Sequence, residues 1–514
     1  MDSSVATRAE RWVLAATILA SSMAFIDGSA LNVALPSIQT SLGATGAGLL
    51  WVVNAYLIML AALILVGGAL GDRFGRKRVF AAGIALFSAA SCACGFSPSL
   101  GFLVVARLVQ GLGGALMIPG SLSLIRVMVA EERRGKAIGT WSAVTTLVTI
   151  AGPLLGGFLS DQGLWRGVFL INLPLGVASL AILWTRVAER PEEDVRRRLD
   201  APGALLAVIA LGAIAYGAIA APERGLGDPR VYLSLAAGVL AAFAFVLVET
   251  RSPAPMLPMS IFSSRRFGGA NLLTLLLYGA LGAATFFISL DLIQAQSYTK
   301  TEAGMAFLPF ALLLTFLSPP AGALADRIGP RPLLVAGPAL SGSGFLLMAF
   351  AGLTAGPAEY WTRFLPGMIL LGLGMGLTVA PLSSTVMGAV DARSAGLASG
   401  INNAAARAAG VLAIAVIGAL ALSIFGRELA RNSRALAIDP AARSALVEEA
   451  GNFGAASVPA AIPLSSAPAA ELAIKNSFSS AFRVVMLLCA ALAWLSSLSA
   501  ALMIGARAQS SARN

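Results

Sequence analysis

The sequence contains no histidine and only three cysteines among its 514 residues. The absence of histidine removes the commonest metal ligand and the usual proton relay near neutral pH, so any proton chemistry must use carboxylates. Cys92 and Cys94 lie in one apolar run and Cys489 lies in another, which favours small buried residues over a disulfide framework. We therefore expect no bound metal and no organic cofactor.

Charged residues are scarce as well, at 12% of the chain against 57% hydrophobic residues. A soluble protein would need about twice that share of charge to cover its surface. The apolar residues fall in many runs of about 20, which is long enough for a helix to cross a bilayer. These features exclude a soluble fold and indicate an all-α, multi-pass protein surrounded by a lipid bilayer.

Fourteen apolar windows, separated by charged breaks, predict fourteen transmembrane helices. Their approximate bounds are residues 12–34, 49–71, 79–95, 101–125, 137–159, 167–185, 202–220, 231–249, 268–292, 303–325, 332–352, 364–388, 397–424 and 484–505. The last two windows enclose a long loop, residues 425–483, which we expect to lie outside the cell. Its charged first part predicts a short surface helix, and its small, proline-containing second part indicates flexible chain, more typical of a solvated excursion than of a lid.

The net charge of +11 comes from arginines and lysines between these windows. They do not form one basic stripe with interleaved aromatic residues, so no nucleic-acid partner is expected. Most of the basic residues in short loops, such as Arg76, Arg126 and Arg265, fall on the side that also holds both termini. Because cytoplasmic loops retain positive charge, both termini are predicted to be cytoplasmic, in a cell inner (plasma) membrane.

The chain contains an internal repeat: residues 68–75 read GALGDRFG and residues 322–329 read GALADRIG. The two copies follow the second and tenth windows, so the repeat spans eight helices. Two six-helix bundles explain this spacing if two helices are inserted between them. We therefore expect bundles at residues 1–190 and 263–514, two inserted helices within 191–262, and a substrate site near the bilayer midplane between the bundles.

The loop after the second window contains the strongest motif, residues 67–78, which read GGALGDRFGRKR. Its glycines permit a tight reversal and close helix approach, and its basic cluster retains the loop inside. Asp72 can cap the following helix or pair with a cation. The candidate gating residues are Gly68, Asp72, Arg73, Gly75 and Arg76.

This loop resembles the conserved loop of the major facilitator superfamily, and four further segments resemble its fourteen-span drug:proton antiporter branch. They are residues 26–36 (IDGSALNVALP), 107–111 (RLVQG), 151–157 (AGPLLGG) and 165–174 (WRGVFLINLP). The resemblance covers essentially the whole chain. It implies the major facilitator fold and export of a small organic compound, drug-like or metabolite, in exchange for protons.

The segment in span five is the one associated with exporters, through Gly152, Pro153, Gly156 and Gly157. Gly152 and Gly156 are four residues apart, so a neighbouring helix can approach that face closely, and Pro153 can bend the span. The pattern alone favours ordinary helix packing and a role in transport equally. The resemblance favours transport.

Asp27, midway along span one, and Arg107, in span four, are ionisable residues inside the membrane. Such residues are costly there and point to function. Desolvation favours neutral Asp27 and a nearby cation favours its charged form, so its protonation can follow access to water or substrate. Arg107 is its natural partner, and the resemblance associates this arginine with proton coupling. The alternative is a permanently paired, structural Asp27.

Other polar residues within the spans are candidates for the substrate cavity. They are Asn32, Gln110, Asp291, Asn402, Asn403 and Arg407. Hydrogen bonding between helices explains Gln110, Asn402 and Asn403 equally well. Asp291 lies toward the outer end of its span, where a hydrated boundary residue is an equal alternative.

The sequence therefore predicts a monomeric, proton-coupled efflux transporter that works by alternating access. The alternatives are a proton-coupled or facilitated uptake carrier and a transport-inactive membrane sensor. An enzyme is not expected, because no nucleophile–base pair or phosphate-binding loop is recognisable.

The predicted topology is testable by cysteine labelling from each side of the membrane, in a background without native cysteines. Cysteines at Gly225 and within residues 425–483 should react from outside, and cysteines at Arg197 and Arg265 should react from inside. Labelling of positions 225 and 197 from the same side would contradict the fourteen-span topology.

Overall fold

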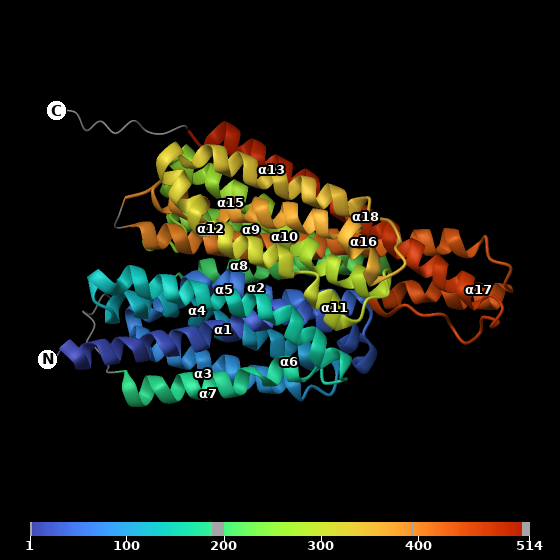
Figure 1. The fold of residues 1–514 in the computed structure, drawn as a ribbon, viewed down its shortest axis with the longest axis horizontal. Coiled ribbons are helices and arrows are strands. Elements are labelled where there is room, and N and C mark those ends of the chain that lie inside the picture. Colours follow the sequence, from blue (N-terminus) through green and yellow to red (C-terminus); the bar gives the residue numbers. More distant parts are fainter. Residues whose placement is uncertain (1–2, 188–199, 392–393, 506–514) are drawn as a thin grey trace.

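The computed structural model describes residues 3–187, 200–391 and 394–505, and within them every regular element is a helix. Fourteen helical segments are long and apolar enough to cross a membrane, which confirms the predicted number of spans. Figure 1 shows these helices side by side in one elongated bundle. We call the end where α1 begins and α18 ends the proximal end, and the end that carries α17 the distal end.

The first six spans form one half of the bundle, drawn blue to teal in Figure 1. They are α1 (Ser3–Leu42), α2 (Gly46–Phe74), α3 (Arg76–Gly95), α4 (Leu100–Met128), α5 (Glu131–Asp161) and the consecutive pair α6 (Gly167–Leu170) and α7 (Asn172–Arg186). We refer to them as the N-half. Residue 197, proposed above for labelling, lies outside the described residues.

The second half begins after a pair of helices, α8 (Ala201–Arg224) and α9 (Pro229–Arg251). Its spans, the C-half, are α10 (Arg265–Gln294), the pair α11 (Lys300–Met305) and α12 (Leu308–Ile328), α13 (Pro330–Ala349), α15 (Leu365–Met387), α16 (Ala395–Ser433) and α18 (Ala467–Met503). Short connecting elements are η1 (Met259–Ser263), η2 (Pro357–Glu359) and α14 (Tyr360–Arg363). Helix α8 contacts both α2 and α16, so the extra pair lies beside the boundary between the halves.

Local sequence signals explain where many of these helices begin. The side chains of Thr45, Ser99 and Ser264 each accept a hydrogen bond from a backbone N–H in the first turn of α2, α4 and α10. Thr299 and Glu302 form a reciprocal capping box at α11. Such caps satisfy backbone donors that have no partner within the helix.

The internal repeat produces the same backbone geometry twice. Gly75 has φ +95° between α2 and α3, and Gly329 has φ +88° between α12 and α13. Glycine adopts this left-handed region without the steric cost that a Cβ imposes. The sequence repeat is therefore a structural repeat, in which two consecutive spans reverse direction at a glycine.

The connection between the last two spans is shorter than the sequence predicts. Helices α16 and α18 contain 39 and 37 residues, about 55–60 Å each at 1.5 Å per residue, so they continue well past a hydrocarbon core about 30 Å thick. The connection is reduced to residues 434–466. Its predicted surface helix is α17 (Pro440–Glu448), and η4 (Glu449–Ala455) follows directly. Helix η4 packs against the bundle, and residues 458–466, most of the part expected to be flexible chain, contain no regular helix.

Phe453 of η4 anchors this segment in an aromatic cluster. Its ring centroid lies 4.7 Å from that of Phe478, 5.2 Å from that of Phe425 and 6.1 Å from that of Phe287, and only 3% of Phe453 is exposed. A Cβ on Gly46 of the N-half would lie 2.7 Å from the Phe453 Cβ. The glycine at position 46 therefore allows η4 to pack against α2.

Two side-chain hydrogen bonds fix the same element to both halves. Gln39 of α1 donates to the Asn452 carbonyl, and Gln294 of α10 donates to the Ala456 carbonyl at 2.6 Å. Residues 449–456 therefore bridge the two halves at the distal end, and we call them the distal bridge.

Replacing Phe453 with alanine should destabilise the protein by about 3 kcal/mol or more, because it removes a buried aromatic ring and leaves a cavity. Thermal unfolding of the purified protein in detergent measures the effect. Leu464→Ala is the matched control, since Leu464 belongs to the same external segment and is 93% exposed. Equal unfolding temperatures for the two variants would contradict a packing role for Phe453.

Candidate functional site

Asp27 of α1 and Arg107 of α4 form an ion pair inside the N-half. The Arg107 Nη1 lies 2.5 Å from the Asp27 Oδ2, and the two side chains are 0–1% exposed. Arg107 also donates from Nε to the Val52 carbonyl of α2 at 3.2 Å. The predicted pairing is therefore present, and in this conformation the pair has no contact with solvent.

Gln110 completes the hydrogen bonding of this pair. Its Nε2 donates to the Asp27 Oδ1 at 2.9 Å, and its Oε1 accepts from the Arg107 Nη1 at 2.7 Å. Gln110 lies one helical turn after Arg107, so α4 presents both groups to the same carboxylate. We predicted Gln110 as a substrate contact or a link between helices, and in this conformation it is such a link.

The network continues into α3 and the α6–α7 pair. Gln110 donates to the Ser91 Oγ at 3.2 Å, Asn172 donates to the same oxygen at 2.9 Å, and Ser91 donates to the Phe169 carbonyl at 2.9 Å. The Cys94 thiol lies 3.6 Å from the Gln110 Oε1. All three cysteines are unpaired; Cys94 and Cys489 are buried and Cys92 is half-buried.

Tyr56 of α2 is a member of the site that the sequence did not indicate. The guanidinium carbon of Arg107 lies 4.4 Å from the centroid of its ring, a distance that permits a cation–π interaction. The sequence offered a signal for Asn172, which lies in the segment WRGVFLINLP. An aromatic residue in an apolar window offers no comparable signal, because packing explains it equally well.

Helix α5 packs against α1 directly beside the ion pair. A Cβ on Gly152 would lie 1.8 Å from the Ser29 Oγ, and a Cβ on Gly156 would lie 2.3 Å from the Ala30 carbonyl oxygen. Real Cβ atoms do not lie this close to backbone, so Gly156 is required for this approach, whereas a Cβ at position 152 would have to displace the Ser29 hydroxyl. The close packing predicted from their spacing is present, and it acts on the turn that follows Asp27.

Helix α5 also contacts the C-half, through a second set of residues that faces α11. A Cβ on Gly157 would lie 2.3 Å from the Lys300 carbonyl oxygen, and a Cβ on Gly304 would lie 2.3 Å from the Pro153 carbonyl oxygen. The four residues of the predicted segment thus contact two different helices. Gly152 and Gly156 face α1, whereas Pro153 and Gly157 face α11. Helix α5 links the acid-bearing helix to the other half of the protein.

Asp161 at the end of α5 strengthens this link. Its carboxylate accepts hydrogen bonds from the backbone N–H groups of Lys300 at 3.1 Å and Thr301 at 2.8 Å, and from the Thr301 hydroxyl at 2.5 Å. A carboxylate at a helix N-terminus satisfies free N–H groups and interacts favourably with the helix dipole. The N-half thus caps a helix of the C-half at the distal end, through a residue that the sequence did not single out.

In the candidate gating loop, the sequence allowed Asp72 either to cap the following helix or to pair with a cation, and the structure shows the ion pair. The Arg76 Nη2 lies 3.0 Å from the Asp72 Oδ1, and both side chains are 29% exposed. No side chain caps α3, whose first backbone N–H groups follow Gly75. Asp72 therefore acts in an ion pair and not as a helix cap. Arg73 stacks near Phe74, with its guanidinium carbon 5.2 Å from the ring centroid.

The glycine that permits close helix approach at this loop is Gly67, and not Gly68. A Cβ on Gly67 would lie 2.0 Å from the Ala115 carbonyl oxygen, whereas a Cβ on Gly68 would meet only the Pro119 Cβ, at 3.9 Å. Position 68 has room for a methyl group. The sequence prediction concerned the glycines of this motif as a group, because adjacent glycines cannot be distinguished without knowing which one faces α4.

Arg407 lies within α16 on the side that faces α2. Glycines 400, 410 and 418, which share this side by helical periodicity, approach Leu65, Leu57 and Leu50 of α2. Arg407 makes no ion pair or hydrogen bond with any described residue, and its Nε is buried without a partner. The side of α16 that carries Arg407 therefore faces the N-half.

The asparagines predicted near the cavity differ in their surroundings. Asn402 donates to the Thr274 hydroxyl at 2.6 Å and to the Asn271 side-chain oxygen at 3.3 Å, so it joins α16 to α10. Asn403 is exposed and donates to the Ser399 carbonyl of its own helix. Asn32 is half-buried and makes no hydrogen bond with the described residues.

Asp291 does not join the Asp27 network. It is fully buried near the distal end of α10, where its Oδ2 accepts a hydrogen bond from Gln296 at 3.1 Å and its Oδ1 has no partner. Gln296 also donates to the Gly352 carbonyl and accepts from Thr354. In this conformation Asp291 is part of a loop-anchoring cluster and does not line an accessible surface.

Comparisons with known proteins agree with this architecture. A sequence profile described as Major Facilitator Superfamily matches residues 17–414 and 270–504. The multidrug resistance protein Stp of Mycobacterium tuberculosis is 34% identical over 446 residues, which cover 86% of this chain and 81% of that protein. The tetracenomycin C resistance and export protein of Streptomyces glaucescens is 34% identical over 408 residues, covering 79% of this chain and 74% of that protein.

The fold is also found among solved structures. A bacterial homologue of the human lysosomal transporter Spinster, solved in an inward-facing and unoccupied conformation, superposes with a TM-score of 0.67. The alignment covers 96% of this chain and 97% of that chain, with 17% sequence identity. At this identity the likeness concerns the fold alone.

The Asp161 cap predicts how the distal end opens. Asp161→Asn should shift the population toward conformations with α5 and α11 separated, about fivefold or more, because hydrogen bonds to a charged acceptor contribute about 1.5–3 kcal/mol. Spin labels at Gln162 and Trp361, in a chain without native cysteines, report the distance between the halves at this end.

Asp439→Asn is the control for the loss of an acidic helix cap. Asp439 caps α17, and both the residue and the helix belong to the C-half, so this cap does not join the two halves. The control should leave the distance distribution unchanged. An unchanged distribution in Asp161→Asn as well would show that the cap does not hold the two halves together.

Proposed function

The chain belongs to the Major Facilitator Superfamily, and we propose that it exports a small organic compound from the cell in exchange for protons. The names of its relatives support the direction of transport, since they are described as resistance and export proteins. The family and the fold indicate a transporter and not an enzyme. The observation that carries the proton-coupled mechanism is the sealed Asp27–Arg107 pair and its connection, through α5, to the C-half.

Protonation of Asp27 is the step that changes the energy of this site. The neutral carboxyl no longer attracts Arg107, and Arg107 is then a buried cation without a counter-ion, which is strongly unfavourable in a low-dielectric interior. The site relaxes by admitting water or a polar substrate group between α1 and α4. Proton binding and the sealed conformation therefore exclude each other.

The contacts of α5 transmit this change. Movement of α1 displaces the segment around Ser29 and Ala30, against which Gly152 and Gly156 pack without spare space. On its other side α5 contacts α11 through Pro153 and Gly157, and Asp161 caps that helix. A rigid shift of α5 thus changes the boundary between the halves, as alternating access requires.

The proposed orientation places the proximal end in the cytoplasm and the distal end outside. The arginine and lysine bias of the short loops supports it, and so does the position of the long external segment. In this orientation the protein is a multi-pass component of the cell inner (plasma) membrane, and the Asp161 cap and the distal bridge close the exit side. We propose that it functions as a monomer.

The two moving bodies in this proposal are residues 1–190 and 263–514, with the inserted helices of residues 191–262 beside their boundary. The substrate binds between the bodies. Asn32, Asn403 and Arg407 remain the proposed contacts, because none of their side chains is bound to a residue of another described helix. Gln110 and Asn402 are assigned instead to links between helices.

Asp27→Asn should abolish uphill, proton-driven export, with a loss of about tenfold or more in substrate accumulated by energised inverted vesicles. The amide is nearly isosteric with the acid but cannot release a proton at neutral pH. Counterflow, which needs no proton gradient, should persist, and substrate-induced proton release from the purified protein should disappear.

Glu249→Gln is the matched control, since Glu249 is another buried acid within the spans but lies on α9, outside the network. It should retain both gradient-driven export and proton release. Wild-type proton release from Asp27→Asn would place the coupling site elsewhere and would make Asp291 the next candidate.

A further inference from the structure

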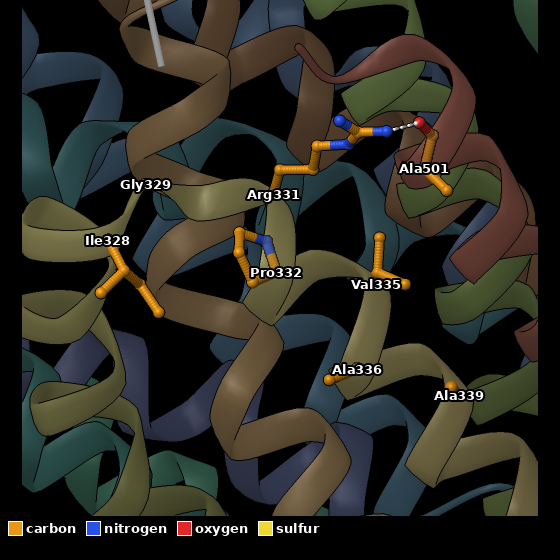
Figure 2. A pocket seen from close by; sticks show the side chains of 8 residues that line it. All are labelled: Ile328, Gly329, Arg331, Pro332, Val335, Ala336, Ala339 and Ala501. Carbon is orange, nitrogen blue, oxygen red and sulfur yellow. Dashed lines mark hydrogen bonds between the residues drawn. The ribbon is translucent and has the colours of Figure 1, made fainter. Parts of the chain in front are cut away.

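A cavity of about 490 Å³ lies at the proximal end of the C-half, between the α12–α13 turn and the end of α18. Figure 2 shows it from close by. The residues that line it are Ile328, Gly329, Arg331, Pro332, Val335, Ala336, Ala339 and Ala501. The second copy of the repeated loop supplies Ile328 and Gly329, and Arg331 is the one charged residue in the lining. The proposed transport mechanism does not use this cavity.

Arg331 retains most of its capacity to bind an anion. Its Nη2 donates to the Ala501 carbonyl at 2.7 Å, drawn as a dashed line in Figure 2, and it makes no other hydrogen bond or ion pair with the described residues. A guanidinium has five N–H donors, so several remain available. The single bond fixes the side chain at the cavity, and no described carboxylate pairs with its charge.

A second arginine lies beside the first. The Arg265 Nη2 donates to the Leu502 carbonyl at 3.1 Å, one residue further along α18. Arg265 likewise forms no ion pair within the described chain. Two guanidinium groups therefore meet at consecutive carbonyls in the last turn of one helix, and neither charge is neutralised by a carboxylate. Arg331 in the lining and Arg265 on the neighbouring carbonyl thus place two positive charges around the end of α18.

The wall behind these arginines is apolar. Pro332, Val335, Ala336 and Ala339 follow one another on α13 at helical spacing, so they form one stripe about 10 Å long, running from the arginines toward the membrane interior. Backbone carbonyls along the stripe already have partners: Ser497 donates to Val335 and Trp494 donates to Ala339. A ligand there meets hydrocarbon surface and few free polar groups.

An anionic head beside a hydrocarbon tail matches this distribution of charge and apolar surface. In the orientation proposed above, the cavity lies at the cytoplasmic interface, where anionic lipids attract basic residues and where basic pockets between helices bind lipid head groups. We infer that this cavity is a binding site for an anionic phospholipid of the inner leaflet. Its phosphate contacts Arg331 and Arg265, and one acyl chain lies along the stripe from Pro332 to Ala339.

The two loops that share this motif differ at the residues that form the site. The Asp72–Arg76 pair of the first copy joins residues four apart, but the position equivalent to Arg76 in the second copy is Pro330. Lys77, which aligns with Arg331, donates to the Val187 carbonyl at the end of α7. The second copy keeps this contact with the last helix of its half, and it presents a guanidinium with spare donors in place of an ammonium group.

The test measures lipid binding by the purified full chain in a neutral detergent, by native mass spectrometry and thermal unfolding. Phosphatidylglycerol should bind and raise the unfolding temperature more than phosphatidylcholine with the same acyl chains. Arg331→Gln should weaken phosphatidylglycerol binding about fivefold or more. Arg331→Lys should have a smaller effect, because it keeps the charge. Inorganic phosphate at the same concentration should give no stabilisation, since it has no hydrocarbon tail.

Two further variants keep the proposal falsifiable if Arg331→Gln fails to fold. Ala336→Phe fills the stripe and leaves both arginines, and it should also weaken phosphatidylglycerol binding. Arg327→Gln removes an exposed arginine at the same end that does not line the cavity, and it should bind the lipid like the unmodified protein.

Equal binding of the two lipids, unchanged binding in Ala336→Phe, or an equal loss in Arg327→Gln would overturn the assignment. Stabilisation by inorganic phosphate alone would make this a simple anion site. The inference rests on the proposed orientation for the identity of the leaflet. The binding readout requires neither transport nor a proton gradient, so a failure of the export proposal would leave this result unaffected and distinguishable.

Discussion

The N-half depends on one constraint, which is that a charge buried in a membrane protein must be compensated. Asp27 and Arg107 compensate each other, and Gln110 and the Val52 carbonyl satisfy the hydrogen-bonding groups that remain. The side chains involved come from different helices, so the demand for compensation fixes how α1, α2 and α4 approach. Protonation of a single carboxyl removes the reason for that arrangement. This is the physical basis of the proton coupling that we propose for the site.

Much of the fold could be predicted because its signals are local. Apolar length determined the fourteen spans, and the repeated glycine at positions 75 and 329 determined two equivalent reversals. The Asp27–Arg107 pair was predictable for a different reason, since two opposite charges within apolar windows have few other possible partners. In each case a short stretch of sequence contains the physical cause of the structure.

Other features were not predictable because their cause lies in a residue or helix that is distant in the sequence. Asp161 lies at a span end, where an acid is unremarkable, and its importance comes from the α11 backbone that it caps. Tyr56 belongs to the site because of where Arg107 points, and Gly67 differs from Gly68 only in facing Ala115. The external segment illustrates the same limit. Residues 449–455 alone gave no sign of a packing contact, and the aromatic surface formed by distant helices explains why η4 is held in place.

The anchoring of the distal bridge has a thermal consequence for transport. Phe453 stacks on residues of the C-half, but Gly46 and Gln39 of the N-half cover the same element from the other side. If the halves separate at this end, the C-half retains the bridge while its N-half contacts become hydrated. Exposure of apolar surface raises the heat capacity, so the free energy of this opening step varies with temperature along a curve. Where this proposed opening step limits turnover, the turnover rate inherits that curvature, and a single activation enthalpy measured over a narrow temperature range does not describe the transport cycle.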